Sequence, residues 1–178
     1  MNIISLNVGA KYRFKTEDLD YKTDKKEDRN FNRKSYLNFD FRMGKVELFP
    51  VGSGSEPYYA ISIFWNKRVS RKSIIDAGVE FFIDMAYEKE IQNHQSIVAA
   101  SPDYKSFSLM VGHELLLNKI ALITQLGVYV YKPYKPEDWL YIKIGLKYYF
   151  TEHIFASYML KSHFAVAEVL EFGIGYRL

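Results

Sequence analysis

Apolar and polar residues alternate along much of the chain with a period of two. Successive side chains of a β-strand point to opposite faces, so this period predicts strands with one apolar and one polar face. In 36–49 the phase of the alternation slips near Gly44, which predicts a β-bulge. In all, the pattern predicts strands over 3–14, 36–49, 57–68, 74–86, 104–116, 119–131, 139–150, 154–162 and 170–178.

The connections between the predicted strands alternate in length. Counted from residue 36, tight turns at one end and long loops at the other would join eight strands, and this arrangement is typical of an up-and-down transmembrane barrel. The connection near 163–167 is short and departs from the rule. We therefore predict an all-β fold over 36–178, an antiparallel up-and-down transmembrane β-barrel of about eight strands. The short connections fall at 69–73, 117–118 and 151–153, and the long ones at about 50–57, 88–103 and 131–138.

Alternation alone does not say which face points inward, because a soluble barrel buries its apolar face and a membrane barrel exposes it. Glycine recurs on the polar face, as at Gly78 and Gly127, where it would make room in a crowded lumen. Aromatic residues also cluster at strand ends, where a membrane interface would lie. Both features favour the membrane barrel, and a soluble barrel that binds an apolar ligand is the alternative. The aromatic residues are Tyr58, Tyr59, Trp65, Tyr129, Tyr131, Trp139, Tyr141, Tyr148, Tyr149 and Phe150.

In the membrane arrangement the polar face encloses charges of both signs. An eight-stranded lumen is filled by side chains, and charges that leave water must pair. We therefore expect a closed, ion-paired interior and no diffusion channel. The acidic residues expected there are Asp76, Glu80, Asp84, Glu114 and Glu171, and the basic ones are Lys143, Lys147, Arg177 and Arg42.

Composition narrows the classes of function. The chain has no cysteine, which excludes disulfides, thiolate metal sites and a cysteine nucleophile. It shows no metal-ligand or Gly-rich cofactor motif, so no cofactor is expected. Its 24 basic and 21 acidic residues are scattered and the net charge is only +3, which gives no reason to expect a nucleic-acid partner. No stretch approaches the roughly 20 apolar residues of a membrane helix.

The first 35 residues do not fit an eight-strand count. Segment 3–14 is predicted to be a ninth strand, and 15–35 is a highly charged linker. Bacterial single-chain barrels have even strand numbers, and the N-terminus lacks the regions of a secretory signal. We therefore separate 1–35 from the barrel at 36–178, and expect either a longer protein or a signal that has been removed.

His163 is the histidine with the strongest case for chemistry. It follows strand 154–162 at the predicted rim, and the returning strand brings Glu168 and Glu171 close. A histidine oriented by a carboxylate, with the Ser162 hydroxyl nearby, contains the parts needed for ester hydrolysis. The alternative is a rim histidine that pairs with a glutamate for structural reasons only.

The chain's final strands resemble the acyloxyacyl hydrolase family of Bacteroidetes-type bacteria, relatives of the PagL-type lipid A 3-O-deacylases. The resemblance spans 36–178, and is carried by the run from Ile142 (IKIGLKYYFTEHIFASYMLKSHFAVAEVLEFGIGYRL) and by Leu126–Tyr131 (LGVYVY). It implies a bacterial outer-membrane barrel that hydrolyses an acyl ester of lipid A, within lipopolysaccharide, through a Ser–His–Glu triad. Asn2–Phe14 resembles a strand that follows an N-terminal copy of the catalytic motif in longer members, which implies that the chain is a C-terminal portion.

The family's catalytic run is His-x-Ser-Asn with a later glutamate. His163 matches its histidine, Glu171 is the better match for the acid, and Glu168 is the second candidate. The serine position falls on Ala165 and the asparagine position on Val166, so the nucleophile is missing from its expected place. A lipid A deacylase and a non-catalytic outer-membrane barrel are therefore both open hypotheses.

Overall fold

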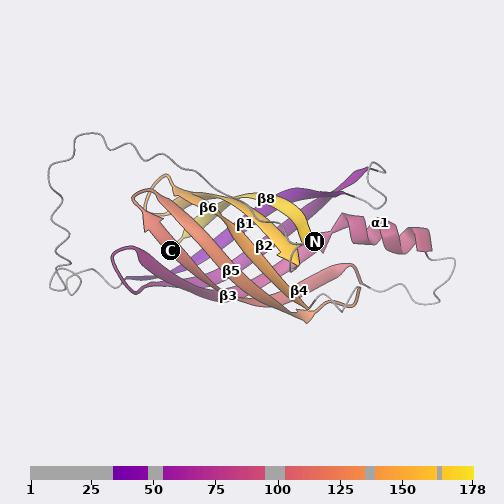
Figure 1. Cartoon of the computed structure of the whole chain (residues 1–178), viewed down its shortest axis with the longest axis horizontal. Helices are drawn as coiled ribbons and strands as arrows, with labels where there is room; N and C mark the ends of the chain where they lie inside the picture. The colour runs from indigo at the N-terminus through magenta and orange to yellow at the C-terminus, as the bar shows by residue number, and fades with distance from the viewer. Residues whose placement is uncertain (1–33, 48–53, 95–102, 135–138, 164–165) are drawn as a thin grey trace, which may run out of the picture. The chain divides into compact units, whose positions relative to one another are not determined.

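The eight predicted strands form a closed barrel (Figure 1). The computed structural model describes residues 34–47, 54–94, 103–134, 139–163 and 166–178. Within them each strand pairs antiparallel with the next, and β1 pairs with β8, which confirms the up-and-down topology. The predicted strand over 3–14 lies outside the described residues. The elements are β1 Ser35–Glu47, β2 Ser55–Arg68, β3 Ser73–Asp84, α1 Met85–His94, β4 Lys105–Leu117, β5 Ile120–Tyr131, β6 Leu140–Tyr149, β7 Ile154–His163 and β8 Val166–Arg177.

The two ends of the barrel differ, as the connection lengths predicted. The turns at 69–72, 118–119 and 150–153 lie at one end with the start of β1 and the end of β8; we call this the short-turn end. The opposite end, which we call the long-loop end, carries α1 and the starts of β2, β4, β6 and β8 (Figure 1). In the tightest short turn Asn118 has φ of 62°, a left-handed conformation that asparagine adopts more readily than most residues.

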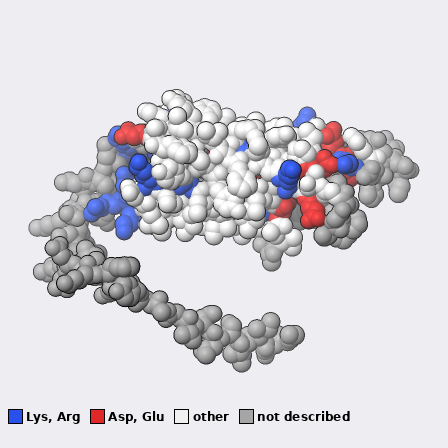
Figure 2. All heavy atoms as spheres, turned by 90° about the horizontal axis from the view of Figure 1, so that it is seen from above, with Lys and Arg blue, Asp and Glu red and all other residues white. Residues whose placement is uncertain are grey.

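The apolar face of the strands points outward and the polar face points inward. On β1, for example, Phe39 and Phe41 are exposed while Asp40 and Arg42 between them are buried. In Figure 2 charged side chains gather toward the two ends of the visible face, and the middle is almost entirely uncharged. This is the inverse of a soluble barrel, whose apolar side chains fill the interior. The predicted orientation of the faces is therefore confirmed.

Glycine makes room for large interior side chains, as predicted. A Cβ at Gly127 would overlap the ring of Tyr141, and one at Gly175 would overlap the ring of Phe155. Both rings are fully buried, so side chains fill the described interior of the barrel at these two levels.

Two details of the strands differ from the sequence expectations. β1 and β2 pair without interruption from Ser35 to Glu47, so the predicted bulge near Gly44 is wrong. The phase slips there because Val46 turns inward while Lys45 lies outside, where β1 leaves the apolar belt. Of the aromatic residues assigned to the interface, Tyr58, Tyr141 and Tyr149 are buried in the lumen, whereas Trp65 and Trp139 are exposed.

Helix α1 was not predicted, because 88–103 had the composition of a loop. Its first turn is capped by Asp84 Oδ1, which accepts hydrogen bonds from the backbone N–H groups of Ala86 (2.9 Å) and Tyr87 (3.3 Å). Ala86 and Ile91 are buried, and α1 contacts β2. Among the described residues, no helix is long and apolar enough to cross a membrane.

Candidate functional site

A cluster of polar side chains lies at the long-loop end of the lumen, where β7 and β8 are joined. His163 is the last residue of β7, and Glu168 is the third residue of β8. The β7–β8 register shifts between Lys161, which faces Val169, and Ser162, which faces Ala167. Glu168 is thus the extra residue of a bulge. Strict alternation would place it outside with Leu170, and the bulge instead turns it toward the lumen.

Glu168 is the acidic partner of His163. Its Oε2 lies 3.3 Å from His163 Nδ1, and the two side chains are only 12% and 10% exposed. A carboxylate next to Nδ1 favours the proton on that nitrogen, which makes Nε2 the basic atom of the ring. The structure therefore assembles a base and the group that orients it.

Two further groups hold the Glu168 carboxylate. Lys161 Nζ lies 2.8 Å from Oε2, and the Tyr87 hydroxyl of α1 donates a hydrogen bond to Oε1 at 3.1 Å. Burial raises the pKa of Tyr87 well above its ordinary value, and the negative charge of Glu168 adds to this. Tyr87 therefore stays protonated and keeps its role as a donor. In this way α1 is tied to the pair at the rim of the barrel.

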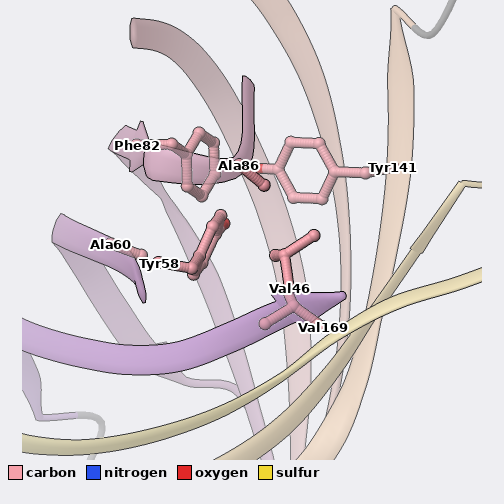
Figure 3. Close-up of a cluster of buried hydrophobic side chains, with 7 residues drawn as sticks. All are labelled: Val46, Tyr58, Ala60, Phe82, Ala86, Tyr141 and Val169. Carbon is pink, nitrogen blue, oxygen red and sulfur yellow. The ribbon is translucent and has the colours of Figure 1, made fainter. Parts of the chain in front are cut away.

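Aromatic rings form the walls of the cluster. The His163 ring stacks on Tyr129, with 5.9 Å between centroids and 21° between planes. Lys161 Nζ lies 4.5 Å from the centroid of Phe82 and 5.1 Å from that of Tyr58. Figure 3 shows the neighbouring interior, where the side chains of Tyr58, Phe82 and Tyr141 gather with Val46 and Val169. The rings reduce contact with water, which strengthens the ionic interactions of Lys161 and Glu168.

Glu171, the other predicted site residue, lies deeper in the lumen and is held by different partners. Its Oε2 lies 2.7 Å from Arg42 Nε and 3.1 Å from Lys143 Nζ. Arg42 and Lys143 also pair with Glu80, and all four side chains are at most 1% exposed. The structure thus brings His163 together with Glu168 and does not bring it together with Glu171. The alternation in the sequence correctly predicted that Glu171 faces the lumen. The bulge at Glu168 nevertheless decides which carboxylate reaches the histidine.

Among the described residues of β7 and β8, no serine hydroxyl lies next to His163 to complete a Ser–His–Glu triad. Ser162 alternates outward, and its hydroxyl lies 3.4 Å from the backbone oxygen of Ile142, to which it donates. Val166, at the asparagine position of the family run, is 70% exposed. Ala165 lies outside the described residues. Within the described ranges no group of three or more His, Asp or Glu residues is placed to hold a metal ion.

Sequence reasoning missed two members of the cluster. Lys161 shares the lumen parity of Ser157 and Met159 on β7, so its inward position follows from the alternation. Tyr87 gave no such signal, because its position depends on the cap that starts α1 and on the packing of the helix against the barrel.

Comparison with known proteins identifies a family and similar folds. The family model described as "Acyloxyacyl hydrolase, C-terminal domain" matches residues 32–178. No curated protein matches the chain.

Three solved structures have folds similar to that of this chain. A de novo designed transmembrane β-barrel is 9% identical, covers 83% of this chain and 98% of its own, and has a TM-score of 0.48. Neisserial surface protein A is 14% identical, and the match covers 81% of this chain and 96% of that protein with a TM-score of 0.47. The attachment invasion locus protein Ail of Yersinia pestis is 10% identical, with 83% and 100% covered and a TM-score of 0.49. At these identities the similarity concerns the fold alone.

Proposed function

Since the chain belongs to the acyloxyacyl hydrolase family through that family's C-terminal domain, we propose that it is an outer-membrane barrel that hydrolyses an acyl ester of lipid A. The observation that carries the proposal is the His163–Glu168 pair at the long-loop end, inside the region that the family model covers. The products of this reaction are a fatty acid and a lipid alcohol.

The surface of the barrel supports a place in the outer membrane. Every strand presents large apolar side chains to the outside, among them Ile63, Val111, Ile144 and Phe172. An apolar surface of this extent in water would be an aggregation hazard, whereas lipid chains would cover it at no such cost. In such a barrel the long loops face the cell exterior, where lipopolysaccharide lies, so the His163–Glu168 pair would be at the substrate's leaflet.

His163 would act as the general base and Glu168 as its positioning residue. The base removes a proton from the attacking hydroxyl as the hydroxyl oxygen bonds to the acyl carbon, and it returns the proton to the ester oxygen, which leaves as the lipid alcohol. Water then hydrolyses the acyl group from the nucleophile and gives the fatty acid. Ser162 is a poor nucleophile candidate, because its hydroxyl points away from the lumen toward the Ile142 backbone. We leave the nucleophile unassigned among the described serines.

We predict that His163→Ala lowers fatty-acid release from lipid A by about 10²–10⁴-fold, the usual contribution of a general base. The measurement is mass spectrometry of lipid A incubated with barrel refolded in detergent. His153→Ala is the matched control, because His153 lies in a short turn at the opposite end and is exposed. Glu168→Gln should reduce release more than Glu171→Gln in samples that are matched for folded protein.

The unmodified barrel decides between the two hypotheses. If it releases no fatty acid under conditions in which a known deacylase works, the enzyme proposal is wrong for this chain. The non-catalytic outer-membrane barrel would then be preferred, and one observation favours it already: alanine stands at the family's serine position, residue 165.

A further inference from the structure

The mouth of the barrel at the short-turn end contains a cavity, at the opposite end of the barrel from the His163–Glu168 pair. It has a volume of about 530 Å³ and is bounded by the ends of β1, β2, β6 and β8 and by the turns at 118–119 and 150–153. This volume is in the range of small-molecule sites. Its floor contains the buried side chains of Asn66, Ile74 and Tyr149, so the cavity is closed toward the lumen.

The charges that line the cavity are strongly unbalanced. Four cationic side chains line it, those of Lys34, Arg68, Lys119 and Arg177, against the single carboxylate of Glu152. None of the four forms an ion pair with a carboxylate in the described part of the chain. Cations concentrated in a concave site with low-dielectric walls attract anions much more strongly than scattered surface charges do.

Arg177 is held in position. Its guanidinium lies between two rings, 4.7 Å from the centroid of Tyr36 and 4.5 Å from that of Tyr149. Its Nε donates to Asn38 Oδ1 at 3.2 Å, and Nη2 donates to the Tyr149 hydroxyl at 2.7 Å. These bonds leave Nη1 without a partner among the described residues, so it can donate to a ligand.

Two buried carboxylates lie beneath the floor, that of Glu114 and that of Asp76, which stands opposite Asn66 in the β2–β3 register. The Tyr149 hydroxyl donates a hydrogen bond to Glu114 Oε2 at 2.6 Å, and Glu114 also pairs with Lys147. Neither carboxylate forms an ion pair with Arg177 among the described residues. The arginine is fixed before any ligand binds, which lowers the entropy cost of binding.

A buried donor in the floor gives a second, independent indication of a ligand. Asn66 is 1% exposed, and its Nδ2 has no hydrogen-bond partner among the described groups. Burying a polar group without a partner is unfavourable, and a ligand that accepts its hydrogen bond would remove that cost. The cavity thus offers an amide donor, a guanidinium donor and three further cations.

We infer that this cavity binds a phosphate group, the oxoanion that suits a guanidinium and several ammonium donors. In an outer-membrane barrel the short turns face the periplasm. Two sources present a phosphate there, a soluble phosphate ester and the headgroup of a phospholipid in the inner leaflet. The site stands apart from the His163 pair and does not depend on catalysis.

The test is a binding titration of the full chain in a non-ionic detergent. The probes are inorganic phosphate and a short-chain phosphatidylglycerol, with chloride at matched ionic strength as the reference anion. We expect binding of at least one probe, and a loss of about tenfold or more in the triple variant Lys34→Gln, Arg68→Gln, Lys119→Gln, which removes three of the four charges. Binding of phosphate without the lipid identifies a soluble ester, and tighter binding of the lipid than of phosphate identifies a headgroup.

The matched control neutralises three lysines at the other end, Lys45→Gln, Lys89→Gln and Lys105→Gln, and should bind as the unmodified protein does. In the unmodified protein, saturation with the bound probe should also shift the side-chain N–H resonances of Asn66 and Arg177 in NMR spectra. The inference is overturned if neither probe binds, if both triple variants lose affinity equally, or if these resonances do not move.

Discussion

Replacing Arg42 by methionine is expected to lower the free energy of unfolding of the barrel by about 3–5 kcal/mol, the cost of leaving buried charges without a partner. Arg42 is 1% exposed and lies between three carboxylates. Its Nη1 is 2.7 Å from Asp40 and its Nε is 2.7 Å from Glu171, and Nη2 pairs with Glu80. Without the guanidinium, Lys143 alone would remain to balance Glu80 and Glu171. No described cation other than Arg42 pairs with Asp40.

The measurement is denaturant unfolding in lipid vesicles, followed by the fluorescence of Trp65 and Trp139, the two tryptophans. Lys45→Met is the matched control, because it removes the same charge from an exposed position on the same strand and should change the stability by no more than about 0.5 kcal/mol. Adding Glu171→Gln to Arg42→Met should recover part of the loss. Equal stability of Arg42→Met and Lys45→Met would show that the lumen network does not stabilise the barrel.

The second large effect concerns the outer surface. Val111→Arg is expected to destabilise the barrel in lipid by about 2–4 kcal/mol, the cost of an arginine near the middle of a bilayer. Val111 is the central residue of β4, it is 57% exposed, and it pairs with Ala77 and Leu126. On a barrel surrounded by water the same change at an exposed position would alter the stability by no more than about 0.5 kcal/mol.

Val69→Arg provides the depth control. Val69 is 40% exposed and lies in the turn after β2, where an arginine can reach water, so the expected cost is about 0–1 kcal/mol. Both variants are compared with the unmodified barrel in the same vesicles. A cost at Val111 no larger than that at Val69 would contradict the proposed membrane location.

The candidate site was only partly predictable. His163 stood out because a histidine at a strand end was followed by two glutamates. Choosing between Glu168 and Glu171 required the β7–β8 register, and the sequence has no mark for the bulge that turns Glu168 inward. A bulge is decided by how two strands pair across the turn, not by the residues of one strand.

The short-turn cavity illustrates the same difference. Its cations lie at positions as far apart in the chain as Lys34 and Arg177 and look scattered in the sequence. Closure of the barrel brings the strand ends together, which places the guanidinium of Arg177 between Tyr36 and Tyr149.

The sequence by itself determined the strands and their antiparallel order, since these depend on local alternation and on the lengths of the connections. It also indicated the inward direction of the charged face, through the glycines that recur on that face. Tertiary structure alone decided the pairing of Arg42 with Glu80, the choice of Glu168 as the partner of His163 and the start of α1 at the Asp84 cap. The physical reason is distance along the chain. A period of two is fixed between neighbouring residues, whereas an ion pair in the lumen depends on strands that meet only after the sheet has closed.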